Sequence, residues 1–389
     1  MAKQNKPAIR FKGFTDAWEQ RKLSEIAGKV TEKNTGLQYV ETLTNSAEFG
    51  IISQRDFFDH DISKLGSLDG YYIVRNEDFV YNPRISTSAP VGPINRNKLG
   101  RTGVMSPLYT VFRPHDIDTT YLEHFFKCGY WYSFMNFNGD SGARSDRFSI
   151  KDDVFFQMPI PVPHIEEQRK IGLFLTRLDH LITLHQRKYD KLQVLKKAML
   201  EKMFPKNGSS VPEIRFKGFT YAWEQRKLGA LCVEFKSGDF ISASDIAENE
   251  AYPVYGGNGL RGFTNHYNHD GEYALIGRQG ALCGNVNYAV GKSYFTEHAV
   301  AVRANKTNQT RFLYYLFSTM NLGQYSGQSA QPGLAVGNLV ELENVVPSKP
   351  EQEKIASFLS SLDNLITLHQ RELEKLQNIK KSMLEKMFV

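Results

Sequence analysis

Apolar side chains recur with a seven-residue period in two long stretches of the chain. In the first stretch, one row contains Leu175, Ile182, Tyr189, Lys196 and Met203, and the second row contains Ile171, Leu178, His185, Leu192 and Met199. The second stretch keeps the same frame, with rows Leu359, Ile366, Leu373, Lys380 and Met387 against Ile355, Leu362, His369, Leu376 and Met383. Heptad spacing of this kind is typical of helices that pair along a narrow apolar seam. The pattern predicts two long helices, and these rows are the expected helix-pair interface.

The two helices are expected to run antiparallel. Each one follows a long segment of different sequence, and parallel pairing would crowd the two segments at one end of the pair. The alternative is that each helix packs only on its own preceding segment. Lys196 and Lys380 occupy equivalent positions in the two seams. They either fix the register of the pair or meet a partner, or they extend their amines from the edge of the seam into water.

The two segments that precede the helices have the pattern of mixed α/β structure. Short runs rich in β-branched and aromatic residues predict strands at residues 71–74, 78–81, 108–112, 273–276 and 299–302. Helices are expected at residues 120–127 and 311–318. Eight glycines fall between Gly256 and Gly284, which predicts tight turns and close approach of the main chain. The predicted fold class is therefore α/β of the mixed α+β kind.

The chain also contains internal repeats. Residues 9–23 (IRFKGFTDAWEQRKL) recur at residues 214–228 with one change, Asp16 against Tyr221. Residues 167–204 match residues 351–388 at 26 of 38 positions. The segments between these blocks, residues 24–163 and 229–347, resemble each other only faintly. This layout predicts a pseudo-two-fold tandem repeat with boundaries at 1–163, 164–208, 209–347 and 348–389.

Composition narrows the class of protein. With 389 residues, 41% of them hydrophobic and 12% aromatic, the chain is expected to fold into more than one globular domain. Cys128, Cys232 and Cys283 are scattered, which favours reduced thiols over disulfides or zinc. Neither a signal peptide nor a membrane-spanning run is apparent, so a cytoplasmic location is expected.

The net charge of +6 suggests nucleic-acid binding, but its distribution is uneven. The first variable segment carries 14 Lys and Arg against 17 Asp and Glu, and the second carries 7 against 10. Each segment is therefore close to −3, and the positive excess lies in the repeated blocks and linkers. The variable segments must either cluster their basic residues on one face or rely on partners for phosphate contacts.

Motifs for catalysis are incomplete. Residues 257–262 match GxGxxG, but the residues that follow do not form the helix that would receive a pyrophosphate. His266, His269, Cys283 and His298 are too scattered for a convincing zinc site. The Asn82–Pro83 pair begins like the NPPY motif of amino-methyltransferases, and the next two residues depart from it. We therefore expect a non-catalytic chain with no metal-binding or cofactor-binding site of its own.

Taken together, the motifs resemble those of the specificity (S) subunit of type I restriction-modification systems, over essentially the whole chain. The resemblance rests on WEQRKL at residues 18–23 and 223–228, on EEQRKI at 166–171 and PEQEKI at 350–355, and on LITLHQR at 181–187 and 365–371. In the second variable segment, residues 252–259, 272–286 and 296–300 look like a target recognition domain. Residues 71–84 and 103–113 look like a divergent version in the first segment.

The resemblance implies two target recognition domains, separated by the helix pair, that each read one half of a bipartite target in double-stranded DNA. It also implies partners: two modification subunits that bind S-adenosylmethionine and methylate adenine, and two restriction subunits that use ATP and Mg. Arg, Gln and Asn in polar loops have the geometry for contacts to base edges. The candidates are Arg84, Arg96, Arg101, Arg144, Arg147, Arg261, Arg278, Gln279, Gln328 and Gln331. A solvated or structural role is equally compatible with each of them.

Two other functions fit the same layout, and a methyltransferase enzyme is a third and weaker alternative. The chain could be a stand-alone DNA-binding regulator with tandem domains, or an interaction scaffold whose coiled coil joins two binding modules. Binding of duplex DNA by the purified chain, with and without a modification subunit, would separate these functions.

Overall fold

A computed structural model describes residues 6–58, 65–140, 146–206, 208–280, 282–326 and 333–388. The chain divides into two compact units: Met1–His185 with Glu372–Val389 form unit 1, and Gln186–Arg371 form unit 2. The long helices α5 (Ile165–Lys202) and α8 (Lys349–Met387) each contribute to both units.

In its described residues, unit 1 contains four small antiparallel sheets, formed by the first variable segment and the strand that precedes it. The largest has the strand order β2-β9-β6-β7, and the others pair β3 with β4, β5 with β8, and β1 with β10. The strands are β1 Glu19–Lys22, β2 Ala27–Lys29, β3 Leu43–Ser46, β4 Gly50–Ser53, β5 Tyr72–Val74, β6 Phe79–Tyr81, β7 Ile94–Arg96, β8 Gly103–Met105, β9 Thr110–Pro114 and β10 Pro159–Val162. The short helices are α1 Gln54–Phe58, α2 Thr119–Lys127, α3 Tyr132–Asn138 and α4 Asp152–Phe155.

Aromatic packing joins the main sheet of unit 1 to its helices. Phe79 of β6 and Phe112 of β9 stack with ring centroids 5.5 Å apart, and both contact Phe126 of α2. Helix α2 begins where the side chain of Asp118 accepts a hydrogen bond from the backbone of Tyr121, which satisfies a free amide of the first turn. One apolar cluster therefore runs from the sheet through α2 to the long helices.

Unit 2 is richer in sheet. One sheet has the order β12-β18-β15-β16, another has the order β14-β13-β17, and β11 pairs with β19. The strands are β11 Glu224–Lys227, β12 Cys232–Ser237, β13 Tyr252–Gly256, β14 Gly259–Thr264, β15 Glu272–Gly277, β16 Val286–Val290, β17 Tyr294–Phe295, β18 Ala299–Ala304 and β19 Glu343–Val346. The shorter helices are α6 Thr310–Thr319 and α7 Val336–Glu341.

The mixed α/β class expected from the sequence is confirmed, and most predicted elements lie within two residues of their observed bounds. The helices expected at 120–127 and 311–318 are α2 and α6. The strand expected at 108–112 is β9, which begins two residues later because Leu108 lies in an exposed turn.

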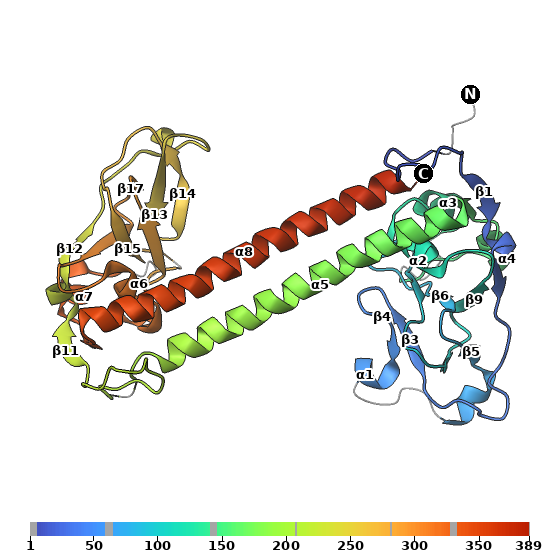
Figure 1. Cartoon of the computed structure of the whole chain (residues 1–389), viewed down its shortest axis with the longest axis horizontal. Helices are drawn as coiled ribbons and strands as arrows, with labels where there is room; N and C mark the ends of the chain where they lie inside the picture. Colours follow the sequence, from blue (N-terminus) through green and yellow to red (C-terminus); the bar gives the residue numbers. More distant parts are fainter. Residues whose placement is uncertain are drawn as a thin grey trace. The chain divides into compact units, whose positions relative to one another are not determined.

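The long helices pack antiparallel in each unit. In unit 1 the first turns of α5, with Ile171, Leu175 and Leu178, share an apolar cluster with the last turns of α8, which include Met383 and Met387 (Figure 1). In unit 2 the first turns of α8, with Ile355, Leu359 and Leu362, share a cluster with the last turns of α5, including Met199 and Met203. The antiparallel arrangement expected from the heptads is therefore present. Each seam also packs on a helix of its variable segment, α2 or α6.

The same junction joins the repeated motif to a long helix in both units. Arg10 donates to the buried Glu167 through Nε at 2.7 Å and Nη2 at 2.8 Å, and the indole of Trp18 donates to Glu167 at 3.2 Å. In unit 2, Arg215 makes the same two-pronged contact with Glu351, at 2.7 Å for both nitrogens. Paired hydrogen bonds between guanidinium and carboxylate are directional and strong, so each junction holds the motif in one orientation.

Backbone pairing completes each junction. Strand β1 pairs with β10, and β11 pairs with β19, both antiparallel. The amide of Ile9 donates to the carbonyl of Lys386 near the end of α8, and the amide of Ile214 donates to Lys202 at the end of α5. Each copy of the motif therefore contacts the start of one long helix and the end of the other.

Candidate nucleic-acid interface

Two of the arginines predicted as base readers in unit 1 are bound to carboxylates of the chain itself. Arg96 lies between Glu77, at 3.0 Å, and Glu123, at 2.6 Å, and only 10% of its side chain is exposed. Arg101 makes a two-pronged contact with Glu41, with both distances 2.7 Å. These contacts hold the end of β7, where Arg96 lies, and the loop that carries Arg101.

Arg84 and Arg147 have a different environment. They face each other in an antiparallel bridge, because the amide of Ile85 donates to Asp146 and the amide of Phe148 donates to Pro83. Hydrogen bonds that flank a pair in this way define the closer type of cross-strand pair, with Cα atoms about 4.5 Å apart. Neither guanidinium has a hydrogen bond or ion pair with any residue that the structure describes.

Both arginines line one cleft of about 340 Å³. Its remaining walls are aromatic and polar and come from several separate segments. They include Thr44, Asn45, Ser46, Phe57, Phe58, Asn82 and Tyr109. Phe57 and Phe58 belong to α1, which follows the β3–β4 hairpin directly (Figure 1), and both rings are partly exposed to solvent.

An asparagine network fixes the floor of this cleft. Asn45 is buried and donates to the carbonyls of Val80 and Pro93, while it accepts from Asn95 at 2.7 Å. Asn82 donates to the Asn45 carbonyl, and its side-chain oxygen accepts from the backbone of Arg84 at 3.0 Å. Buried polar groups with satisfied hydrogen bonds hold a rigid local structure. The backbone of Arg84 is therefore fixed before any ligand arrives.

Gly92 allows its backbone to pass close to the backbone of Asn82 at the base of the cleft. Its φ is +85°, and a Cβ at this position would lie 2.1 Å from the carbonyl oxygen of Asn82. Only glycine fits that approach without displacing the Asn82 backbone. Of the residues of this cleft, Arg84, Arg147 and the Asn82–Pro83 pair stood out in the sequence. The contributions of Asn45, Asn95 and the α1 rings come from distant positions and gave no sequence signal.

The candidates in unit 2 gather around a close approach of two turns. Gly257, between β13 and β14, packs against the end of β15: a Cβ on Gly257 would lie 3.5 Å from the carbonyl oxygen of Gln279. Arg261 follows this turn, and Arg278 exchanges backbone hydrogen bonds with His298 and Leu334. The side chains of Arg261, Arg278 and Gln279 make no hydrogen bond or ion pair with described residues. Arg144, Gln328 and Gln331 lie outside the described part of the chain.

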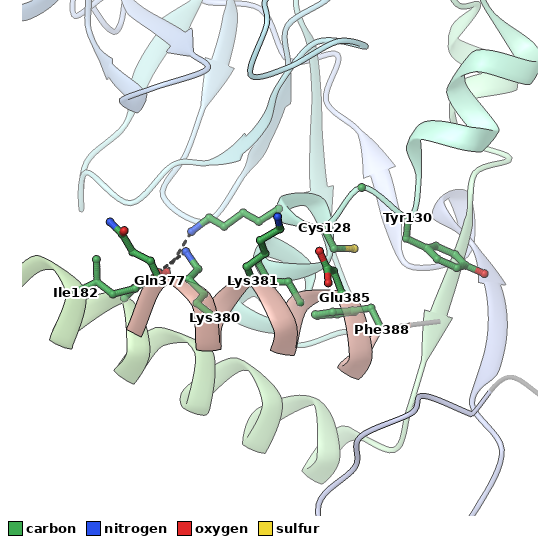
Figure 2. Close-up of a pocket in the computed structure, with 12 residues that line it drawn as sticks. Cys128, Tyr130, Ile182, Gln377, Lys380, Lys381, Glu385 and Phe388 are labelled. Atoms are coloured by element: carbon green, nitrogen blue, oxygen red, sulfur yellow. Dashed lines mark ion pairs between the residues drawn. The ribbon is translucent and has the colours of Figure 1, made fainter. Parts of the chain in front are cut away.

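A larger cavity, of about 680 Å³, lies in unit 1 between the loop after α2 and the long helices. Figure 2 shows Lys380, Lys381 and Glu385 extending from α8 toward the loop that carries Cys128 and Tyr130. Asp179 of α5 pairs with Lys380 and, at 3.6 Å, with Lys127. Burial raises the pKa of the Cys128 thiol to about 12, so it is not a nucleophile near neutral pH.

Metal-binding and membrane-spanning features were also sought. Across the described ranges, no group of three or more His, Cys, Asp or Glu side chains is placed to hold a metal ion. Among the described helices, none combines the length and the apolar character needed to cross a bilayer.

The two units share the same junction and the same pair of long helices but carry different polar, loop-rich surfaces. Comparison with known families gives the same picture of a repeated domain. The model of the type I restriction modification DNA specificity domain matches residues 15–194 and 221–378. The chain therefore belongs to this family, as the sequence motifs indicated, and it carries two target recognition domains.

Individual relatives give the same result. The chain is 44% identical over 156 residues to the type I restriction enzyme EcoprrI specificity subunit of Escherichia coli, covering 39% of each protein. It is 23% identical over 266 residues to the type I restriction enzyme MjaVIII specificity subunit of Methanocaldococcus jannaschii, covering 60% of this chain and 62% of that one. The matched regions thus span less than two thirds of either relative. The crystal structure of the S subunit from M. genitalium shares the fold, with a TM-score of 0.68, 15% identity and 99% of both chains covered.

Proposed function

We propose that this chain is the DNA-sequence specificity subunit of a type I restriction-modification complex. It reads a bipartite target in double-stranded DNA, one half with each target recognition domain, and is itself non-catalytic. Two modification subunits, with S-adenosylmethionine, methylate adenine in each half, and two restriction subunits, with ATP and Mg, cleave. The complex works in the cytoplasm.

One observation carries this proposal. The Arg10–Glu167 and Arg215–Glu351 junctions have the same geometry, while the surfaces attached to them have different sheets and different loops. A protein that binds two unrelated half-sites needs the same junction in both units, with a different DNA-contacting domain, or reader, attached to each junction. We assign the central conserved helix and its linker to residues 164–208 and the C-terminal conserved helix to residues 348–389. The two readers, each a target recognition domain with its copy of the repeated motif, are residues 1–163 and 209–347.

Base reading is assigned to side chains that the chain does not use internally. In the first reader these are Arg84 and Arg147, whereas Arg96 and Arg101 are paired with carboxylates of the chain itself. In the second reader they are Arg261, Arg278 and Gln279. Arg144, Gln328 and Gln331 remain candidates from sequence alone. The rows of apolar seam residues form the helix-pair interface in this assignment.

The charge of the readers supports dependence on partners. Since each variable segment is close to −3, phosphate contacts that supply most salt-dependent affinity must come largely from elsewhere. The isolated chain should bind duplex DNA weakly and gain sequence preference when modification subunits are added. Tight, sequence-specific binding by the purified chain alone would instead favour a stand-alone regulator, and absence of DNA binding with partners present would favour a scaffold.

An exchange of readers tests the proposal directly. Residues 24–163 are replaced by the equivalent segment of another family member, and adenine methylation is mapped in cells that express the chimera with its partners. One half of the methylated target should change and the other half should stay the same. The matched chimera exchanges residues 229–347 and should change only the other half. A change in both halves by either chimera contradicts independent readers.

A further inference from the structure

The cleft that holds Arg84 and Arg147 has an unbalanced charge. Like charges directly opposite each other on paired strands are destabilising. Here two arginines occupy the closer type of cross-strand pair, and neither guanidinium forms an ion pair with a carboxylate of the described residues. The arrangement is explained if a ligand with hydrogen-bond acceptors lies between or beside them in the functional state.

The rest of the cleft favours a ligand that is recognised through hydrogen bonds of defined direction. A contact to a phosphate tolerates a flexible side chain, because its acceptor oxygens point in several directions. Arg84 is instead held at its backbone by Asn82, which is held by Asn45, and Asn45 is buried. This rigid support is typical of a site in which the orientation of the contact carries the information.

The spacing of the two arginines fits neighbouring bases. Opposed Cβ atoms in such a pair are about 4.5–5.5 Å apart, and successive base pairs rise by about 3.4 Å. Guanine presents two acceptors, O6 and N7, in the major groove, and the fork of an arginine contacts both at once. The rings of Phe57 and Phe58 line one side of the cleft, where an apolar wall strengthens hydrogen bonds made beside it.

We propose that Arg84 and Arg147 together form the guanine-reading element of the first target recognition domain. They contact one guanine, or two neighbouring guanines, of the first half-site in the major groove. Asn82 and Asn45 act as positioning residues for this element. The proposal rests on the function proposed above and names the base chemistry of one reader.

The experiment uses the specificity chain assembled with its modification subunits. The first half-site is mapped by methylation of cellular DNA, and synthetic duplexes then carry 7-deazaguanine, which lacks N7, at each guanine in turn. The variants are R84K and R147K, which keep the charge and lose the two-pronged contact, and the double variant. The matched control is R75K, since Arg75 lies in the same unit, is exposed and makes a single contact with Glu32.

The wild-type complex should lose affinity when one guanine, or two neighbouring guanines, of the first half-site is replaced. R84K and R147K should be insensitive to that replacement and lose roughly 5- to 150-fold of the discrimination against other bases. The second half-site should be read as before, and R75K should behave like the wild type. Retention of the wild-type target by the double variant overturns the proposal, and so does a first half-site without guanine on either strand.

A phosphate contact has a different signature. If alanine variants weaken binding to all sequences equally and lower the slope of log affinity against log salt by about 1 per arginine, the two residues bind phosphate and the proposal is wrong. If the wild-type complex produces no bipartite methylation, the proposed function itself fails, independently of these variants. Assembly with modification subunits and binding to the second half-site verify that each variant is folded.

Discussion

Glu167 and Glu351 are buried acidic residues in equivalent positions, with one difference between them. Glu167 accepts hydrogen bonds from both Arg10 and Trp18, whereas Glu351 accepts from Arg215 while the indole nitrogen of Trp223 is buried without a described partner. Removal of either carboxylate leaves a guanidinium that is only 13–14% exposed without its partner.

We therefore expect E167A to lower the free energy of unfolding by about 3–5 kcal/mol, as for other broken buried ion pairs. E351A should cost about 1 kcal/mol less, because no indole hydrogen bond is lost. Denaturant unfolding combined with hydrogen exchange of each unit measures both. E25A is the control: its ion pair with Arg21 is exposed and 3.9 Å long, and its loss should cost less than about 1 kcal/mol. Equal costs for E25A and E167A would contradict the role of the junction.

Because of His124, the stability of unit 1 should depend on pH. Burial lowers its pKa from 6.5 to about 4; Lys127 and Lys380 act in the same direction, and Asp179 and Glu123 oppose them. Because the folded state favours the neutral ring, the stabilisation is complete above pH 6.5 and is lost as the pH falls toward 4.

The variant H124Q does not titrate and keeps a donor near Thr176. Between pH 7 and pH 4, the wild type should lose on the order of 2–3 kcal/mol more stability than H124Q. Urea unfolding of both proteins at several pH values provides the measurement. Parallel loss of stability in the two proteins would show that the ring does not titrate in this window.

At the scale of single residues, the sequence could name candidate base-reading arginines but could not tell which of them are paired with carboxylates of the chain itself. Arg84 and Arg96 both lie in polar surroundings in the sequence. The partners that occupy Arg96 are Glu77 and Glu123, and Glu123 becomes its neighbour only when α2 packs beside β7. Pairing of this kind depends on tertiary structure, so the distinction between the two arginines requires the fold.

Among the elements, the long helices were the most predictable. Their heptad frame is set by local periodicity, and all the rows of seam residues are buried or half-buried. The order β2-β9-β6-β7 could not be predicted, because these strands have only three to five residues and pair across long stretches of chain. Strand order is then decided by side-chain packing rather than by local pattern.

The seam lysines are paired with aspartates of the opposite helix. Lys196 of α5 contacts Asp363 of α8 at 2.5 Å, and Lys380 contacts Asp179. Polar pairs in an apolar seam specify register, since a shifted helix would leave them without partners. This favours the register role over lysines that simply extend into water.

Double-mutant cycles test the register role. The cycle with K196A and D363A should give a coupling of about 0.5–1 kcal/mol in denaturant unfolding, because both side chains are partly buried. The cycle with K380A and D179A should give less, since Asp179 also pairs with Lys127. Couplings near zero in both cycles would mean that the lysines do not fix register.

For the whole molecule, the repeat was visible in the sequence, but its division between units was not. A simple reading of the tandem repeat assigns each helix to the segment before it. In the structure each unit combines the start of one long helix with the end of the other. The reason is antiparallel pairing, which brings Met387 to Ile171 and Met203 to Ile355 in their shared clusters.

The amide of Ile9 bonds to Lys386 and the amide of Ile214 bonds to Lys202, so each copy of the repeated motif starts beside the end of a long helix. Nine residues connect Phe204 to Ile214, and direct fusion of Val389 to Met1 would place nine residues between Phe388 and Ile9. A circular permutant that starts at Ser209 and ends at Gly208 should therefore fold and direct methylation to the same bipartite target. A permutant opened within β6, between Val80 and Tyr81, should fail to fold, because that strand is buried. If the first permutant folds but recognises another target, the order of the two halves along the chain matters; if it recognises the same one, recognition depends on how the halves pack and is indifferent to which half comes first.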